Sequence, residues 1–127
     1  MFVSGLDHYN LCAPRTLLDE LCEFYRNVVG LELGERPSFA EFGYWLYAGG
    51  DPVLHLSEAD SPRADTRNAG FNHAAFRCTD YAGTKRHLIK HGIEYRVARV
   101  PGTGIVQLFI SDPAGNGIEL NFDSDKA

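Results

Sequence analysis

The sequence of 127 residues repeats its own pattern once, and this repeat limits the possible folds more than any other feature. Chemically similar residues return in the same order in the second half of the chain. The matched positions are His8 with His73, Gly30 with Gly92, and His55 with Glu119. Such self-similarity indicates two copies of one supersecondary unit.

Each half is predicted to contain a strand, a helix and three further strands. Apolar residues at three- and four-residue steps predict the first helix, with Thr16 and Asp19 as a capping box and Gly30 as the stop. Asp80 is expected to cap the second helix, which would run to His91. The predicted strands are 6–13, 31–35, 42–48, 52–58, 71–78, 93–100, 105–111 and 117–122.

The fold class that follows is α+β, with two tandem βαβββ modules. A chain of 127 residues is the size of one domain and can bury enough apolar surface to fold without disulfides or metals as staples. We therefore expect a single domain over 1–127. Module one covers about 1–59, a polar linker covers about 60–69, and module two covers about 70–127.

Composition narrows the possible partners and the cellular location. The net charge of −5 argues against a nucleic-acid partner, because phosphate binding needs clustered Lys and Arg. The three cysteines leave one without a partner under any pairing, which favours reduced thiols in a cytoplasmic protein. No apolar stretch approaches the roughly 20 residues that span a bilayer, so we expect no membrane association.

Strand alternation places the polar candidates on one face of each predicted sheet. His8 shares its side with Asn10 and Cys12, and His55 lies on the last strand of the same half. In the second half His73 shares its side with Arg77. Gln107, Glu119 and Asn121 alternate with apolar residues that face the helix. These polar side chains are expected on the face that the helices leave open.

Three imidazoles and one carboxylate form a ligand set for a borderline divalent ion. Zn²⁺, Ni²⁺, Fe²⁺ and Mn²⁺ all accept such ligands, whereas Ca²⁺ and Mg²⁺ prefer oxygen alone. The metal site is therefore predicted at His8, His55, His73 and Glu119, and ligand type leaves the identity of the ion open. The aromatic side chains of Tyr44, Trp45 and Phe109 are candidates for the walls of a substrate site.

Four segments together resemble the vicinal oxygen chelate superfamily, which includes glyoxalase I, extradiol dioxygenases, fosfomycin-resistance transferases and bleomycin-binding proteins. The resemblance spans nearly the whole chain. The segments are 6–11 (LDHYNL), 24–31 (FYRNVVGL), 71–76 (FNHAAF) and 112–120 (DPAGNGIEL).

The resemblance implies a fold, a metal site and an assembly. Members use paired βαβββ modules whose strands form a cupped sheet around a metal, with ligands at the positions of His8, His73 and Glu119 and often His55. It also implies a homodimer in which His8 and His55 of one chain face His73 and Glu119 of the other. The implied chemistry is chelation of two neighbouring oxygens of a small-molecule substrate, with stabilisation of an enolate-like intermediate.

Three functions remain open at this point. The first is a glyoxalase-like lyase or isomerase with Glu119 or His55 as the proton carrier. If His55 stays off the metal, two histidines and one glutamate suit Fe²⁺ and a ring-cleaving dioxygenase. The third is a metal-free binding protein of the bleomycin-resistance type. Cys12 stands where glyoxalase I has an arginine, and Ala59 where it has an asparagine, so the glutathione-binding pattern is not matched.

Overall fold

The computed structural model describes residues 6–60, 71 and 73–123. The chain divides into two compact units, 1–66 and 67–127, and each is described here by itself. The predicted linker at 60–69 lies almost wholly outside the described residues. No helix among the described residues is long and apolar enough to cross a membrane.

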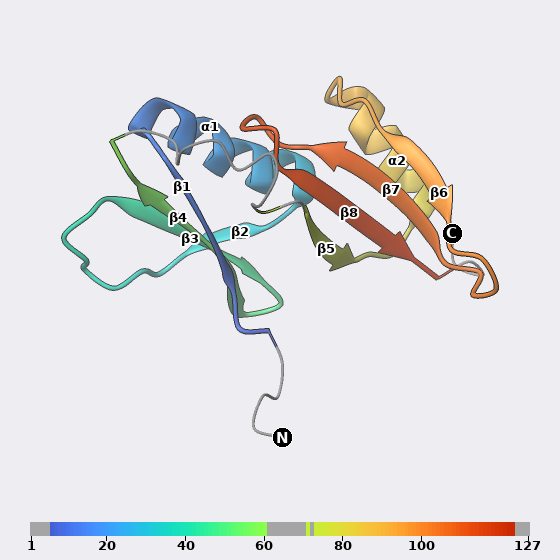
Figure 1. Cartoon of the computed structure of the whole chain (residues 1–127), viewed down its shortest axis with the longest axis horizontal. Coiled ribbons are helices and arrows are strands. Elements are labelled where there is room, and N and C mark those ends of the chain that lie inside the picture. Colours follow the sequence, from blue (N-terminus) through green and yellow to red (C-terminus); the bar gives the residue numbers. More distant parts are fainter. Residues whose placement is uncertain (1–5, 61–70, 72, 124–127) are drawn as a thin grey trace. The chain divides into compact units, whose positions relative to one another are not determined.

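The first unit is a four-stranded sheet with one helix on one face (Figure 1). Its elements are β1 (Tyr9–Ala13), α1 (Arg15–Phe24), the π-helical turn η1 (Tyr25–Val29), β2 (Glu32–Gly34), β3 (Gly43–Ala48) and β4 (Asp51–Glu58). The strand order is β1-β4-β3-β2, with β1 parallel to β4 and the other neighbours antiparallel. Leucines of α1, β3 and β4 form the core between helix and sheet, and Leu18, Leu46, Leu54 and Leu56 are fully buried.

The second unit repeats this topology. Its elements are β5 (His73–Arg77), α2 (Tyr81–Lys90), β6 (Arg96–Arg99), β7 (Val106–Ser111) and β8 (Gly117–Phe122). The strand order is β5-β8-β7-β6, with β5 parallel to β8. Leu88 of α2 is fully buried, and Tyr81 packs edge-on against Phe122 of β8. The expected α+β fold with two tandem βαβββ modules is therefore confirmed.

Some predicted element ends are wrong. Helix α1 begins after Pro14, and no side chain caps it, so the predicted capping box of Thr16 and Asp19 is absent. Its last turn widens into η1 before Gly30 ends it in the left-handed conformation, with φ of 94°. In α2 the prediction holds, because the side chain of Asp80 accepts a hydrogen bond from the Gly83 amide at 3.0 Å.

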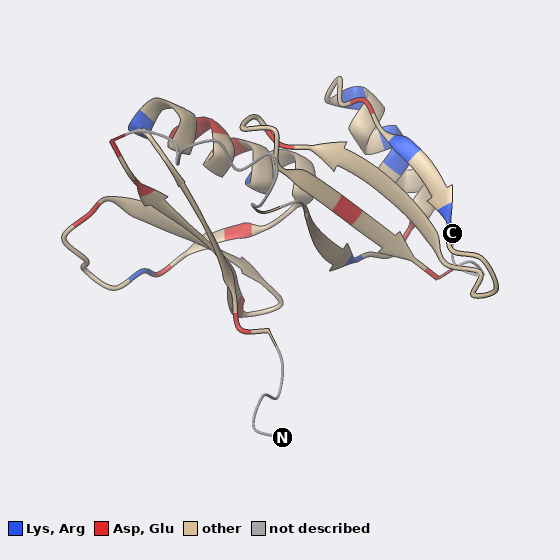
Figure 2. Cartoon of the chain, viewed as in Figure 1, with Lys and Arg blue, Asp and Glu red and all other residues tan. Residues whose placement is uncertain are grey.

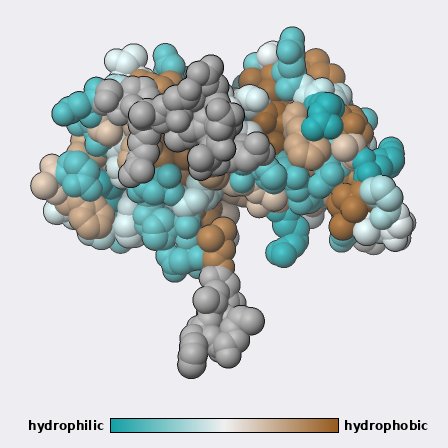
Figure 3. Space-filling model, in the orientation of Figure 1, coloured by the Kyte–Doolittle hydropathy of each residue, from teal (hydrophilic) through white to brown (hydrophobic). Residues whose placement is uncertain are grey.

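The two units differ in surface charge. Acidic residues lie along α1, whereas Lys and Arg gather on α2 and β6 (Figure 2). On the face that Figure 3 shows, hydrophobic and hydrophilic residues are intermixed. Among the described residues, the large apolar side chains that stay exposed are Leu6, Leu33, Phe39, Phe71, Ile89 and Val97. The helix-free face of each sheet carries the polar residues considered next.

Candidate functional site

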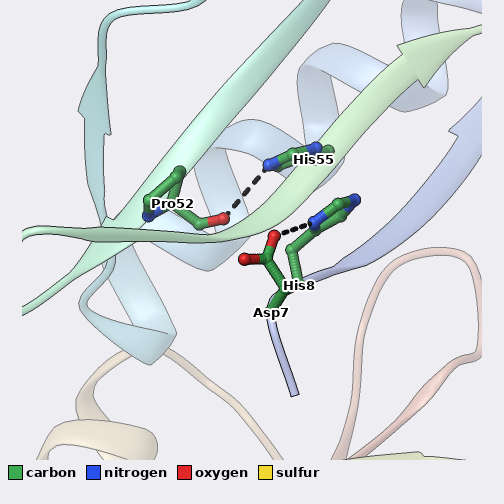
Figure 4. A network of polar contacts seen from close by, with 4 residues as sticks. All are labelled: Asp7, His8, Pro52 and His55. Atoms are coloured by element: carbon green, nitrogen blue, oxygen red, sulfur yellow. Dashed lines mark hydrogen bonds and ion pairs between the residues drawn. The ribbon is translucent and has the colours of Figure 1, made fainter. Parts of the chain in front are cut away.

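The first pair of predicted ligands comes together in the first unit. His8 precedes β1, His55 lies in β4, and the two imidazole rings stack with centroids 3.7 Å apart and 15° between their planes (Figure 4). Parallel pairing of β1 with β4 sets Asn10 opposite His55 and Cys12 opposite Ser57. Because side chains alternate along a strand, His8 lies on the same face as Asn10. The sheet register thus brings the two imidazoles into contact.

Each imidazole has a partner that fixes one of its nitrogens. His8 Nδ1 donates a hydrogen bond to Asp7 Oδ2 at 2.6 Å, which leaves the lone pair on Nε2. A carboxylate that holds the second nitrogen in this way is common among histidines that bind metals. His55 Nε2 lies 3.1 Å from the Pro52 carbonyl, so it donates there and its Nδ1 carries the lone pair.

His55 is enclosed by aromatic rings. Trp45, its partner across β3 and β4, stacks on it with centroids 4.0 Å apart and 10° between planes. The three rings of Trp45, His55 and His8 therefore form one stack, and His55 is only 8% exposed. Burial, and then the charge of nearby His8, lowers the pKa of His55. A lowered pKa favours the neutral imidazole, which is the form that a metal ligand or a general base needs.

The second pair of predicted ligands comes together in the second unit. His73 begins β5, Glu119 lies in β8, and His73 Nε2 is 3.5 Å from Glu119 Oε1. Two donors that share one ion with bonds of about 2.1 Å lie roughly 3 Å apart, so this spacing fits a common ion. The second oxygen of Glu119 accepts a hydrogen bond from Asn121 Nδ2 at 2.8 Å. Glu119 is thereby oriented, and its side chain is 13% exposed.

Other predicted site residues share the open face of the second sheet. Phe109 and Ala75 flank Glu119 across the strands, and Gln107 and Arg77 flank Asn121. Arg96 lies over the ring of Phe109, with its Cζ 4.4 Å from the ring centroid. A recess of about 760 Å³ opens beside His73 and is lined by residues that include Arg96 and Phe109.

Three further residues bear on the site. Asn10 Nδ2 donates to Ser57 Oγ at 3.0 Å, and Cys12 Sγ lies 3.4 Å from Asn10 Oδ1, so both predicted residues stay on the open face with His55. Tyr44 does not join them. Alternation turns it toward α1, where its hydroxyl donates to Asp19 Oδ1 at 2.6 Å.

The four predicted ligands thus form two pairs, one in each unit. Among the described residues, no group of three or more His, Cys, Asp or Glu side chains converges as a metal site. The pairs occupy equivalent places in the repeat: one member lies at the start of the first strand or just before it, and the other lies on the last strand of the module. Sequence reasoning missed Arg36, which lies on the same open face as Trp45. Arg36 follows β2 outside any regular strand pattern, so alternation gave no signal for it.

Comparison with known proteins identifies the family. The sequence profile of the Glyoxalase/Bleomycin resistance protein/Dioxygenase superfamily matches residues 5–120. The chain therefore belongs to this superfamily, which is the vicinal oxygen chelate superfamily. Among curated proteins no sequence match was found.

Solved structures share the fold over nearly the whole chain. A glyoxalase family protein from Bacillus anthracis is 26% identical with a TM-score of 0.79, and the match covers 97% of this chain and 98% of that one. A lactoylglutathione lyase from Agrobacterium tumefaciens is 27% identical with a TM-score of 0.72, covering 98% and 97%. A glyoxalase family protein from Enterococcus faecalis, at 23% identity and a TM-score of 0.72 over 95% and 99%, supports the fold alone.

Proposed function

We propose that this chain is a divalent-metal-dependent, glyoxalase-like lyase or isomerase that acts on a small molecule with two neighbouring oxygens. His8, His55, His73 and Glu119 would hold the ion. The observation that carries the proposal is that two pairs of donors occupy equivalent places in the two modules and that each pair is already in contact. The similarity to a lactoylglutathione lyase supports the reaction class.

The complete site needs both pairs, and we propose that a homodimer assembles it. His8 and His55 of one chain would meet His73 and Glu119 of the other. Two donors are too few for an ion that takes four to six ligands, so neither pair is sufficient alone. Two similar modules, each with one pair of donors on its open face, suit a two-fold arrangement in which each chain completes the site of its partner.

The roles of the side chains follow from their surroundings. These side chains would hold an ion that would supply Lewis-acid stabilisation to two neighbouring substrate oxygens. Glu119 is the proposed proton carrier: Asn121 holds its Oε2, and Oε1, the oxygen that lies beside His73, would take a proton once substrate displaces this carboxylate from the ion. Neutral His55 is the second candidate, since its Nδ1 has a lone pair. The remaining open-face residues, Asn10, Cys12, Trp45, Arg77, Gln107, Phe109 and Asn121, are proposed to contact substrate.

One observation favours an Fe²⁺ dioxygenase as the second candidate. His55 is only 8% exposed, and its ring is stacked between the rings of Trp45 and His8. If these contacts persist when the metal binds, His55 stays off the ion. His8, His73 and Glu119 then form the two-histidine, one-carboxylate set that Fe²⁺ enzymes use for oxygen chemistry.

The decisive measurement is elemental analysis of protein purified without chelator, followed by titration of stripped protein with Fe²⁺, Ni²⁺, Mn²⁺ and Zn²⁺. We expect one ion per chain. His73→Ala and Glu119→Ala should weaken binding by more than about a hundredfold, since even loss of a ligand's outer partner costs about ten- to a hundredfold. Both variants should stay folded, because these open-face side chains add little to the core.

His91→Ala is the matched control. His87 and His91 are a second pair of histidines, with ring centroids 4.5 Å apart at the C-terminal end of α2. This variant should bind metal as the wild type does. Unchanged affinity in both His73→Ala and Glu119→Ala would refute the ligand assignment. Absence of any metal affinity would favour the metal-free binding protein instead.

A further inference from the structure

Arg36 lies against the open face of the first sheet, a position that the sequence patterns did not predict. A Cβ built on Gly43 would meet the Leu56 carbonyl oxygen first, and it would sit 2.7 Å from Arg36 Nη2 and 2.9 Å from Arg36 Cζ. Gly43 lies in β3 two residues before Trp45, so its missing side chain leaves room for the guanidinium next to the aromatic stack. A larger residue at position 43 would collide with the Leu56 carbonyl and with the Arg36 guanidinium.

The guanidinium is largely buried and only partly paired. The Arg36 side chain is 14% exposed, and its Nε is buried with no hydrogen-bond partner among the described residues. Its Nη2 lies 3.6 Å from Glu41 Oε1, longer than a charge-assisted hydrogen bond, and Glu41 is half exposed. Phe39 lies beneath the cation, with 4.8 Å between Cζ and the ring centroid. A cation in such surroundings gains from an anion that satisfies its free donors.

A recess gives a ligand access to this cation. It has a volume of about 470 Å³ and is lined by Glu35, Arg36, Pro37, Trp45 and Tyr47. Tyr47 is held in place by a hydrogen bond from its hydroxyl to the Glu35 carbonyl at 2.6 Å. Trp45 forms a wall of the recess and also stacks on His55, so the recess lies one ring away from a proposed metal ligand.

We propose that Arg36 binds an anionic group of the substrate, most simply a carboxylate, in the recess between Trp45 and Tyr47. The planar fork of arginine matches a carboxylate with two parallel hydrogen bonds, and the two aromatic walls suit a flat apolar body. This assignment rests on the proposed function. Together they define the substrate class as an organic acid that has two neighbouring oxygens in addition to its carboxylate.

The anion site is tested without metal, so that its failure is distinct from failure of the metal site. Trp45 is the single tryptophan of the chain, and its fluorescence reports binding in the recess directly. Chelator-treated protein is titrated with benzoate and with neutral benzamide, which has the same shape. We expect benzoate to bind at least about tenfold more tightly than benzamide, because only benzoate can form a charge-assisted hydrogen bond with Arg36 through a carboxylate. Arg36→Met should abolish that preference.

Two further variants separate an anion site from a structural role. Arg26→Met removes an exposed arginine of the same unit and should leave the benzoate affinity unchanged. Glu41→Gln removes the competing carboxylate, so it should tighten benzoate binding if Arg36 receives the anion. If Arg36 only orders its loop through Glu41, the same variant would weaken binding instead.

Several results would overturn the proposal. They are equal affinities for benzoate and benzamide in the wild type, an unchanged preference in Arg36→Met, and loss of the preference in Arg96→Met rather than in Arg36→Met. The last would place the anion in the recess of the second unit. If Arg36→Met fails to fold, Glu41→Gln decides the question. Metal affinity, measured separately on the same variants, is expected to be unchanged.

Discussion

Tyr44 and Trp45 are neighbours in β3 that serve opposite faces of the sheet. The hydrogen bond to Asp19 raises the pKa of Tyr44 to about 12. Because the folded pKa exceeds the unfolded value of about 10, this contribution to stability is complete below pH 10 and is lost as the pH rises toward 12. Tyr44→Phe should lower the free energy of unfolding by about 1 kcal/mol at pH 8. The difference in unfolding free energy between wild type and Tyr44→Phe, measured with urea, should be smaller at pH 11. The metal affinity of the variant should equal that of the wild type. An equal difference at both pH values would contradict the assignment.

At the same scale, strand alternation predicts faces but not every occupant of the site. It placed His8, His73 and Glu119 with the polar residues of each strand, which is where the structure has them. It cannot place both Tyr44 and Trp45 in one cup, since adjacent strand residues point apart. Strand alternation could not predict Arg36, because this residue lies after β2 in a segment without regular secondary structure.

At the scale of elements, the turn between β7 and β8 sets the position of Glu119. Buried Asp112 accepts hydrogen bonds at 2.9 Å from the Ala114 amide and at 2.8 Å from the Asn116 amide, and its other oxygen accepts from Asn116 Nδ2. Asp112→Ala leaves these donors unpaired and should cost about 2 to 3 kcal/mol of unfolding free energy. Asp80→Ala, which removes the exposed cap of α2, should cost about 1 kcal/mol. Thermal or urea unfolding of both variants tests this order, and a larger cost for Asp80→Ala would refute it.

Turns and helix stops were predictable because particular residues are required there. Gly30 and Gly115 have φ of 94° and 86°, a backbone conformation that glycine adopts without strain. Gly30 ends η1 where the sequence predicted a helix stop, and Gly115 lies in the turn between β7 and β8, between the strands predicted at 105–111 and 117–122. The start of α1 could not be predicted from Thr16 and Asp19. The Asp19 carboxylate accepts a hydrogen bond from Tyr44 of β3, and no side chain caps the helix. A tertiary contact of this kind leaves no local sequence signal.

At the scale of the whole molecule, the proposed shared site makes a prediction that no single-chain site allows. A His8→Ala/His55→Ala double variant and a His73→Ala/Glu119→Ala double variant should each lose tight metal binding. When the two are mixed, unfolded and refolded together, half of the dimers are mixed if the chains pair at random. In each mixed dimer, one composite site lacks all four ligands and the other keeps all four. Metal titration of the mixture should therefore recover about one site per mixed dimer, as expected for two sites related by two-fold symmetry. If each site were built from one chain, every site in the mixture would lack two ligands and no tight binding would return.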